Sequence, residues 1–350
     1  MMDETVSIIF SVVEPMLFRG PGEFDPYAKG VYSRAMSRIM PSPSTVAGTL
    51  ATYCITKLNK PLPTNSKDWI EQYLLVLGDD IRIKGPILYL NNEFMVEGRT
   101  LEILWSIDSL KQKCEIEYNK LVQKIRTDRL SKYLVEEKKE KCKVYIKKDV
   151  RTGVRLETRK ETRNVEEGEK FLYNIEYVDY INYPAKILIE LRGSLVKELS
   201  SIQPLPVRFG GENRVAILSS QSGAKILDEI KRKLWNNIDR SSGVLALYLA
   251  TPAIFKEDKK IEEHIKEFVE NKDYEYLGLS GESMILGAGF SIGERKRKPI
   301  YKALEPGSII FVKGEFNLIQ LYIESALGEA TQLGYGTFIP VPLSDQTFTL

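Results

Sequence analysis

Two adjacent glycines flanked by arginines form the segment of this sequence best suited to hold a chain of phosphates. Gly210 and Gly211 lie between Arg208 and Arg214 in the run Val-Arg-Phe-Gly-Gly-Glu-Asn-Arg. Glycine has no side chain, so phosphates can approach the main-chain N–H groups, and flanking guanidinium groups can hold the phosphate oxygens. A tight turn whose arginines face water would have the same local sequence. Both interpretations are open at this point.

A second glycine-rich stretch, Gly287–Gly293, precedes four consecutive cations, Arg295, Lys296, Arg297 and Lys298. The glycine spacing differs from the dinucleotide-binding pattern GxGxxG, and no strand–turn–helix setting surrounds it. Flexible backbone beside dense positive charge suits a nucleic-acid backbone. A solvated run of charges is an equally good interpretation of this stretch alone.

No catalytic apparatus is identifiable in the sequence. The GxxxxGK[ST], GxSxG and HExxH motifs are absent, and no carboxylate pair has a spacing that demands catalysis. The one histidine, His264, falls on the charged side of a predicted helix, so we expect a solvated surface residue. The sequence therefore predicts a binding protein with no catalytic residues, no metal site and no cofactor.

Composition is that of a globular protein of ordinary hydrophobicity. The chain has 350 residues, 43% of them hydrophobic, and a net charge of only +2. A polyanion would have to be met by local basic patches rather than by the field of the whole protein. The three cysteines show no CxxC or Cys/His spacing, and no apolar run reaches the roughly 20 residues of a membrane span. We expect a cytoplasmic protein without membrane contact.

The elements that must position these residues mix strands and helices without a regular βαβ alternation. Apolar periodicity and capping residues predict strands at 6–13, 170–178, 185–191, 243–252 and 309–313, and helices at 45–57, 222–235, around 264 and at 318–327, with 69–77 undecided between the two. This pattern favours an α+β fold of two packed units, each an antiparallel sheet with helices on one face.

A basic segment at about 111–169 differs from the rest of the chain. Within it, Lys143–Lys147 and Val154–Arg159 alternate like the two strands of an exposed hairpin. The segment is either a solvated insertion or a basic finger that touches nucleic acid or a partner.

Several weak motifs in the same order give this sequence a resemblance to one family. They are Glu14-Pro15 with Phe18-Arg19-Gly20, Pro41–Gly48, Arg208–Arg214, Leu249–Phe255, Lys302–Phe311 and Gly334–Thr337. Together they resemble the RAMP-superfamily proteins that form the third subunit of the type III-B CRISPR (Cmr) effector complex. The resemblance runs from the first strand to the last loop, except for the basic insertion.

The resemblance implies two ferredoxin-like (RRM-like) RAMP domains with a Gly-rich loop, placed at 1–190, with the basic insertion, and at 191–350. It implies a non-catalytic structural subunit for antiviral defence that binds the 5′ tag of crRNA. Its protein partners would be the large palm-domain subunit and the backbone RAMP subunit.

Carried over by position, the RNA-binding residues fall into three groups. Arg208, Gly210, Gly211 and Arg214 would line the path of the tag. The start of the helix at 45–57, with Ser42 and Ser44, would offer N–H groups to a phosphate, helped by Arg34 and Arg38. The third group is Arg295, Lys296, Arg297 and Lys298.

Alternatives stay open at this stage. The chain would otherwise be a RAMP endoribonuclease that processes CRISPR repeat RNA, with Lys or Tyr in place of a catalytic histidine, or a scaffold that contacts only proteins. The type III-A counterpart of the subunit is a further alternative. Whether RNA bases stack on Phe209, Phe290 or Tyr335 is also open.

Overall fold

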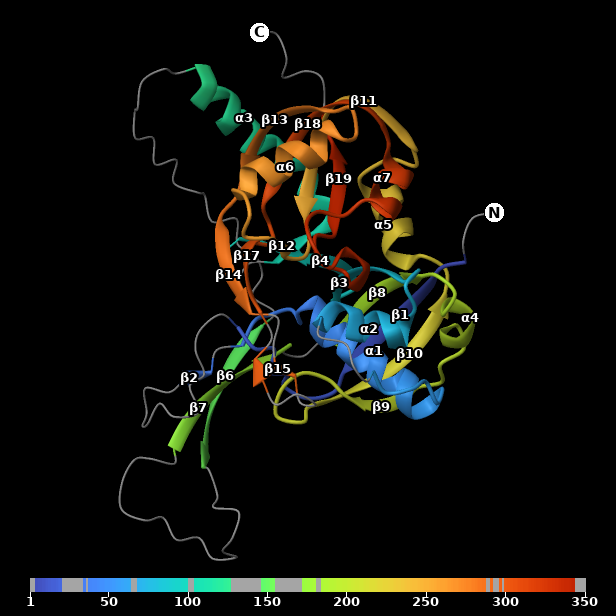
Figure 1. Cartoon of the computed structure of the whole chain (residues 1–350). Coiled ribbons are helices and arrows are strands. Elements are labelled where there is room, and N and C mark those ends of the chain that lie inside the picture. The colour runs from blue at the N-terminus through green and yellow to red at the C-terminus, as the bar shows by residue number, and fades with distance from the viewer. Residues whose placement is uncertain are drawn as a thin grey trace, which may run out of the picture.

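A computed structural model describes residues 4–20, 34–35, 37–63, 68–99, 104–126, 146–154, 172–180, 184–287, 290–291, 296–297 and 299–343. Its fold is a mixed α/β arrangement of antiparallel sheets covered by helices (Figure 1). None of the helices in these ranges is both long and apolar enough to cross a membrane.

The larger sheet has seven antiparallel strands in the order β5-β4-β3-β8-β1-β10-β9. These strands are β1 (Val6–Val12), β3 (Arg82–Leu90), β4 (Glu93–Glu97), β5 (Leu104–Ser106), β8 (Lys186–Arg192), β9 (Leu205–Arg208) and β10 (Val215–Ser222). The central strand β1 pairs with β8 on one side and with β10 on the other. Chain segments far apart in sequence therefore meet in one sheet.

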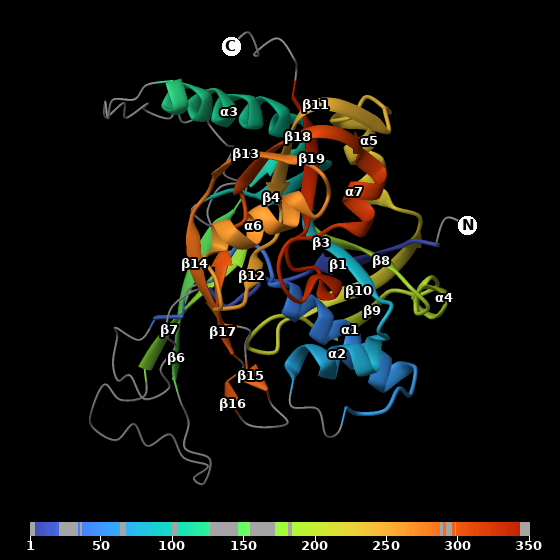
Figure 2. The same cartoon turned by 45° about the horizontal axis from the view of Figure 1, so that its top comes forward.

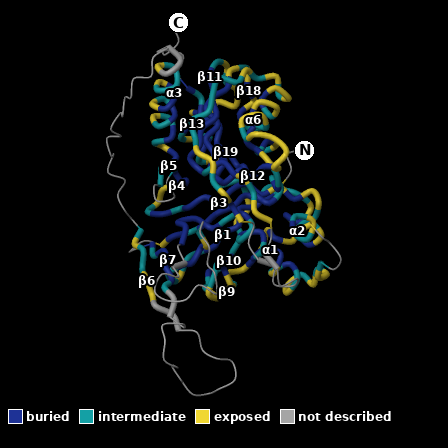
Figure 3. Tube along the Cα trace, turned by 60° about the vertical axis from the view of Figure 1, so that its left-hand side comes forward, coloured by how far each residue is buried: buried dark blue, intermediate teal, exposed yellow. Residues whose placement is uncertain are grey.

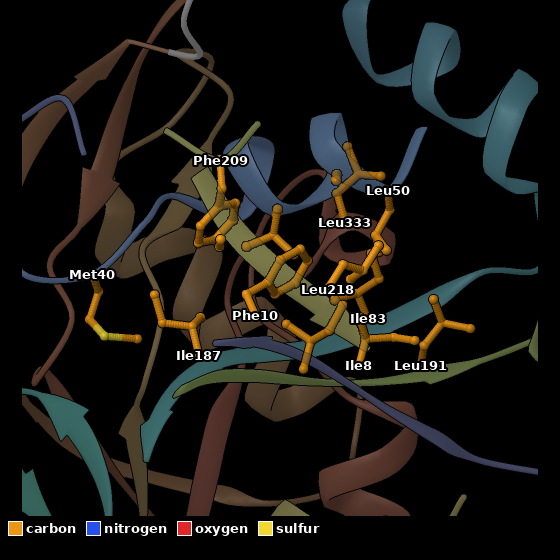
Figure 4. Packing of buried hydrophobic residues seen from close by; sticks show 14 of the residues in the cluster. Ile8, Phe10, Met40, Leu50, Ile83, Ile187, Leu191, Phe209, Leu218 and Leu333 are labelled. Atoms are coloured by element: carbon orange, nitrogen blue, oxygen red, sulfur yellow. The ribbon is translucent and has the colours of Figure 1, made fainter. Parts of the chain in front are cut away.

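Two helices, α1 (Pro43–Lys57) and α2 (Trp69–Leu77), cover one face of this sheet. Ser42 caps α1 by accepting a hydrogen bond from the N–H of Thr45, and Pro43 occupies the first turn. Leu50 of α1 packs on Ile8 and Leu218 of the sheet in the first core cluster (Figure 4). The predicted helix at 45–57 and its serine cap are confirmed, and the undecided segment 69–77 is helical.

The second sheet has four antiparallel strands in the order β13-β18-β11-β19. They are β11 (Arg240–Leu249), β13 (Glu275–Ser280), β18 (Ile309–Asn317) and β19 (Phe338–Pro342), and around them lie the helices α3 (Leu110–Arg126), α5 (Lys225–Lys233), α6 (Ile261–Glu270) and α7 (Leu318–Glu324). The core of this half includes Ile87 and Leu188 from the larger sheet. This second core cluster therefore contains residues from both sheets, and buried residues are dark blue in Figure 3.

Smaller sheets extend from this body. One contains β12 (Ala253–Phe255), β14 (Ser283–Gly287) and β17 (Ile300–Leu304), and its hairpin continues into the short pair β15 (Phe290–Ser291) and β16 (Lys296–Arg297). The other contains β2 (Arg34–Ala35), β6 (Lys147–Val154) and β7 (Leu172–Asp179). The remaining short helices are α4 (Val196–Leu199) and single 3₁₀ turns at Ile107–Ser109 and Thr331–Leu333.

The hairpin predicted from Lys143–Lys147 and Val154–Arg159 is wrong. Its turn would lie at 148–153, but β6 runs straight through those residues and pairs with β7 from Lys147↔Asp179 to Val154↔Leu172. The alternation of charged and apolar residues identified extended chain but not its partner, because register depends on the strand opposite.

The boundary predicted at residue 190 does not coincide with the change from one sheet to the next. Strand β8 spans it and ends at Arg192, and β9 and β10 lie beside β1 in the larger sheet. The second sheet starts only with β11 at Arg240.

The expectation for His264 is also wrong. Its side chain is only 18% exposed, with Nε2 3.2 Å from Oδ1 of Asp258. The ring stacks on Phe255 at 5.4 Å between centroids. The imidazole therefore packs on β12 rather than pointing into solvent.

Candidate nucleic-acid interface

The glycine–arginine segment forms the tight turn between β9 and β10. Glu212 and Asn213 occupy the left-handed region, with φ of 54° and 55°. The N–H of Phe209 donates to the carbonyl of Arg214 at 2.7 Å, which closes the turn. Two consecutive left-handed residues are typical of hairpin turns that match the twist of the flanking strands. The turn therefore holds Arg208 and Arg214 at the ends of paired strands.

The two glycines serve close packing against the chain segment 16–20. A Cβ on Gly210, which has φ of 84°, would lie 2.6 Å from the carbonyl oxygen of Leu17. The N–H of Gly211 donates to that same oxygen at 2.8 Å. This amide is already used inside the protein, so the proposed phosphate cradle does not apply to Gly211.

Arg214 is fixed by two neighbours. Its Nη1 lies 2.6 Å from Oε2 of Glu14, and its guanidinium lies 4.2 Å from the centre of the Tyr177 ring. Burial alone would raise the pKa of Glu14, but hydrogen bonds from the Val215 N–H and from Arg214 outweigh it and lower the pKa. Only 16% of the Arg214 side chain is exposed. Arg214 therefore links the start of β10 to β7, and a small part of its side chain reaches the surface.

Arg208 differs from Arg214 because its side chain is exposed. Its carbonyl accepts a hydrogen bond of 3.3 Å from the hydroxyl of Thr49, which ties the end of β9 to α1. No carboxylate in the described ranges pairs with its guanidinium. Of the predicted arginines whose side chains are described, Arg208 is the one best placed to meet a ligand.

Arg38 points inward, against the expectation for an RNA contact. Its side chain is 3% exposed, and Nη2 lies 2.9 Å from Oε2 of Glu97. Its backbone N–H donates to the carbonyl of Phe18, which turns the residue away from solvent. Burial raises the pKa of Glu97, and the charge of Arg38 opposes that rise. The pair belongs to the interior, where Nε and Nη1 of Arg38 have no hydrogen-bond partner in the described residues.

The start of α1 is also largely occupied. The hydroxyl of Ser42 lies 2.9 Å from those of both Ser44 and Thr45. The hydroxyl of Tyr73 donates to the carbonyl of Ser44 at 3.4 Å. Ser42 therefore acts as the helix cap, and neither serine is fully exposed.

Two of the three aromatic residues considered for base stacking lie in the core. Phe209 is 0% exposed and stacks on Phe10 at 4.5 Å between centroids, as Figure 4 shows. Tyr335 is 1% exposed and packs on Trp69. Neither ring is available to an RNA base. Phe290 lies in β15, whose side chains are outside the description.

The remaining predicted residues are described only in part. Arg34, Lys296 and Arg297 are described by their backbone in β2 and β16, and Arg295 and Lys298 lie outside the described residues. In the views of both Figures 1 and 2, β15 lies between β9 and the β6–β7 pair. The second basic stretch is therefore carried by a hairpin tip, not by a phosphate-binding loop before a helix.

Two residues at this surface were not among the predicted contacts. Tyr177 of β7 lies under Arg214, and the guanidinium of Arg151 lies 5.2 Å from the same ring. Arg151 belongs to the basic segment at about 111–169. Its approach to Arg214 depends on the packing of β7 beside the 16–20 segment, through the Met16↔Val178 bridge, so no local signal reveals it. We call Arg151, Arg208 and Arg214 the arginine face.

The fold and this surface define a class: a mixed α/β protein of antiparallel sheets whose hairpins and loops carry arginines to one side. Residues 99–343 match the family model described as CRISPR-associated protein (Cas_Cmr3). The chain belongs to the Cmr3 family of CRISPR-associated proteins.

Individual relatives agree with this family. The chain is similar to the CRISPR system CMR subunit Cmr3 of Saccharolobus solfataricus, with 27% identity over 321 residues and 89% of each protein covered. Two cryo-EM structures of the type III-B Cmr-beta, both bound to cognate target RNA and one also to AMPPnP, contain chains of similar fold. In the first the TM-score is 0.59, at 23% identity, with 95% of this chain and 96% of that chain covered. In the one that also contains AMPPnP it is 0.56, at 23% identity, covering 87% and 86%.

Proposed function

We propose that this chain is a non-catalytic structural subunit of a type III-B CRISPR effector complex and binds the 5′ tag of the crRNA on its arginine face. The observation that carries the proposal is the exposed Arg208 at the β9–β10 turn of a Cmr3-family chain. A guanidinium without an acidic partner in the described residues is free to bind phosphate oxygens in pairs.

We propose different roles for the two arginines of the turn. Arg208 contacts the RNA, whereas Arg214, held by Glu14 and Tyr177, keeps the turn against β7. Arg34 and the basic run 295–298 are proposed as further contacts, which β2 and the β15–β16 hairpin would bring to the same side. Arg38, Ser42 and Ser44 support the elements beneath.

The proposed protein partners are the large palm-domain subunit and the backbone RAMP subunit. Support for them is the family itself and the relative named as a CMR subunit. The proposed fold is two ferredoxin-like units, for which the two antiparallel sheets with their helices provide the frame. Co-purification of the tagged chain with each subunit separately tests the partners.

A binding measurement tests the RNA contact. RNA with the 5′ tag and RNA without it are titrated into the chain, alone and with its large-subunit partner, at several salt concentrations. Arg208→Ala is expected to weaken tag-dependent binding and to reduce the slope of log K against log salt by about 0.7, the contribution of one phosphate on a single strand.

Arg240→Ala is the matched control, because Arg240 is also exposed but lies at the start of β11 in the second sheet. Equal affinity and equal slope for the Arg208→Ala variant and the unaltered chain would contradict the site. Tag-independent binding, or none, would favour a scaffold that contacts only proteins.

The absence of catalysis needs its own test. Repeat RNA incubated with the purified chain is expected to stay intact, since the sequence has a single histidine, His264, whose ring stacks on Phe255. A defined cleavage product that disappears with a point variant would instead support the endoribonuclease alternative.

A further inference from the structure

A small pocket lies where β3 of the larger sheet meets α6 and α7 of the second half. Its volume is about 180 Å³. In Figure 1, β3 lies below both helices. The lining includes Arg82 and Lys84 from β3, Phe268 and Lys272 at the end of α6, and Glu324 and Ser325 at the end of α7. Helix α1 covers the opposite face of the sheet, so this pocket is separate from the arginine face.

Lys84 lines this pocket, and its ammonium group has few hydrogen-bond acceptors. The residue is 6% exposed, and its Nζ donates one hydrogen bond of 2.6 Å to the carbonyl of Ser325. An ammonium group carries three N–H donors. The Tyr322 ring lies 5.9 Å from Nζ and offers its π face rather than an acceptor oxygen.

The acid opposite Lys84 on the neighbouring strand has other hydrogen-bond partners. Glu190 of β8 is directly opposite Lys84 in the strand register. Its Oε1 accepts from the N–H of Leu227 at 2.8 Å, and its Oε2 accepts from the hydroxyl of Tyr322. It forms no ion pair with Lys84 in the described residues. The lysine is therefore buried beside an acid that two other donors hold.

More cations surround the same place. Arg82 is directly opposite Arg192 in the register of β3 and β8, and like charges at opposed positions are destabilising. The Nη1 of Arg82 donates to the carbonyls of Asp79 and Ile81, and Lys272 lies over the Phe268 ring. None of Arg82, Lys84, Arg192 and Lys272 pairs with a carboxylate in the described part of the chain. Arg82, Lys84 and Lys272 line the pocket, and Arg192 lies opposite Arg82 on the neighbouring strand; we call this group of four the cation pocket.

We propose that the cation pocket binds a phosphate-sized dianion, either free inorganic phosphate or the terminal phosphate of a small nucleotide. An anion there would accept hydrogen bonds from Lys84, Arg82 and Lys272 and would separate the opposed arginines. Its volume of about 180 Å³ fits a phosphate group with a little water rather than a large ligand. Because the cations come from β3, β8 and the end of α6, the bound anion would join the two halves of the molecule. This proposal is independent of RNA binding.

Proton linkage gives the proposal a distinctive signature. Burial lowers the pKa of Lys84 to about 7; Arg192, Arg82 and Lys272 lower it too, and Glu190 opposes them. Burial raises the pKa of Glu190 to about 7. The other charged group at the pocket is Glu324 of α7. An anion favours the charged lysine, so binding above pH 7 must take up a proton, and affinity must fall as the pH rises.

Calorimetric titration of the full chain with sodium sulfate tests this signature, because sulfate stays a dianion from pH 6 to 9. At pH 8, measured in two buffers of different ionisation enthalpy, uptake of about one proton per sulfate is expected, and at pH 6 little. Arg82→Gln and Lys272→Gln are each expected to weaken binding about tenfold. Lys84→Met is expected to abolish both binding and proton uptake.

Lys313→Gln is the control, since Lys313 is an exposed lysine of β18 and should leave the titration unchanged. Circular dichroism checks that each variant is folded. Because Arg82 and Lys272 lie at the pocket rim, their variants still test the proposal if Lys84→Met does not fold. Titrations with inorganic phosphate and with adenosine monophosphate separate the two sources of the anion, and tighter binding of either one supports the site. The proposal would be overturned if none of the three anions bound at about 20 mM. It would also be overturned if all three pocket variants bound as tightly as the unaltered chain.

Discussion

Cations gather in two regions of this protein, and the two regions hold them differently. On the arginine face, Arg214 has Glu14 and Tyr177 as neighbours, and Arg151 has Asp149. In the cation pocket, Arg82 faces Arg192 across two strands and Lys84 has a single carbonyl. On the arginine face, two of the three cations have acidic partners and Arg208 has none in the described residues. None of the four cations at the pocket pairs with a carboxylate in the described residues. A cation with acidic partners inside the protein has a structural role, whereas a cation without them can bind a ligand. The density of charge along the sequence does not distinguish the two.

The largest effect that would test this distinction is expected at Arg38, a buried cation whose ion-pair partner Glu97 is buried as well. Arg38→Ala leaves Glu97 buried without its ion-pair partner, which typically lowers the free energy of unfolding by about 3–5 kcal/mol. Urea denaturation measures the loss. The double variant Arg38→Met with Glu97→Leu should recover most of it. A single variant as stable as the unaltered chain would mean that pairing does not matter here.

Acid pH offers the next largest effect. Glu117 is nearly buried; burial alone would raise its pKa, but hydrogen bonds from Ser280 and Lys120 and the charges of Arg99 and Lys113 lower it from 4.5 to about 2. Because the pKa is lower in the folded state, this stabilisation is complete above pH 4.5 and is lost as the pH falls toward 2, by about 3 kcal/mol in all. Denaturation at pH 6 and pH 3 should show a larger loss for the unaltered chain than for Glu117→Gln. Equal losses would contradict the role of Glu117 as a shared neutralising group.

A smaller effect should distinguish the two arginines of the turn. Arg214→Ala removes the contacts to Glu14 and Tyr177, and we expect the free energy of unfolding to fall by about 1–2 kcal/mol. RNA binding then weakens only indirectly, through loosening of the turn. Thermal unfolding of this variant beside Glu14→Gln gives the measurement. If Arg214→Ala kept full stability but lost RNA affinity, Arg214 would be a direct RNA contact.

The smallest stability effect is expected for Arg208→Ala. Its exposed side chain has no acidic partner in the described residues, so the free energy of unfolding should change by no more than about 0.5 kcal/mol. The loss should appear instead in the salt dependence of RNA binding. A destabilisation as large as that of Arg214→Ala would show that Arg208 is also a structural cation.

Local features of the fold could be predicted from the sequence, and long-range ones could not. Ser42 and Pro43 define the start of α1 by capping and by a fixed φ, both of which act within one turn. Strand β6, by contrast, pairs with β7, which lies beyond residues 155–171 in the sequence, and the hairpin predicted for it was wrong. The domain boundary predicted at residue 190 falls within β8, and β10 pairs with β1, a strand far away in the sequence.

The candidate site shows the same limit. The turn at 208–214 was recognised from its glycines, but their purpose is close contact with Leu17, which no nearby residue indicates. Arg38 was predicted to contact RNA because nothing near it in the sequence indicates its buried ion pair with Glu97 of β4. The cation pocket could not be found at all, since Arg82, Lys84, Arg192 and Lys272 form no run in the sequence.

The late residues Leu333 and Tyr335 belong to the core cluster of the larger sheet, next to residues of β1 and α1. A Cβ on Gly334 would lie 2.6 Å from the carbonyl of Gly85 in β3, so this loop fits tightly into the sheet. Strand β1 therefore needs a segment far downstream in the sequence to complete its packing. Nascent chains that stop before residue 330 would expose apolar surface on the α1 side.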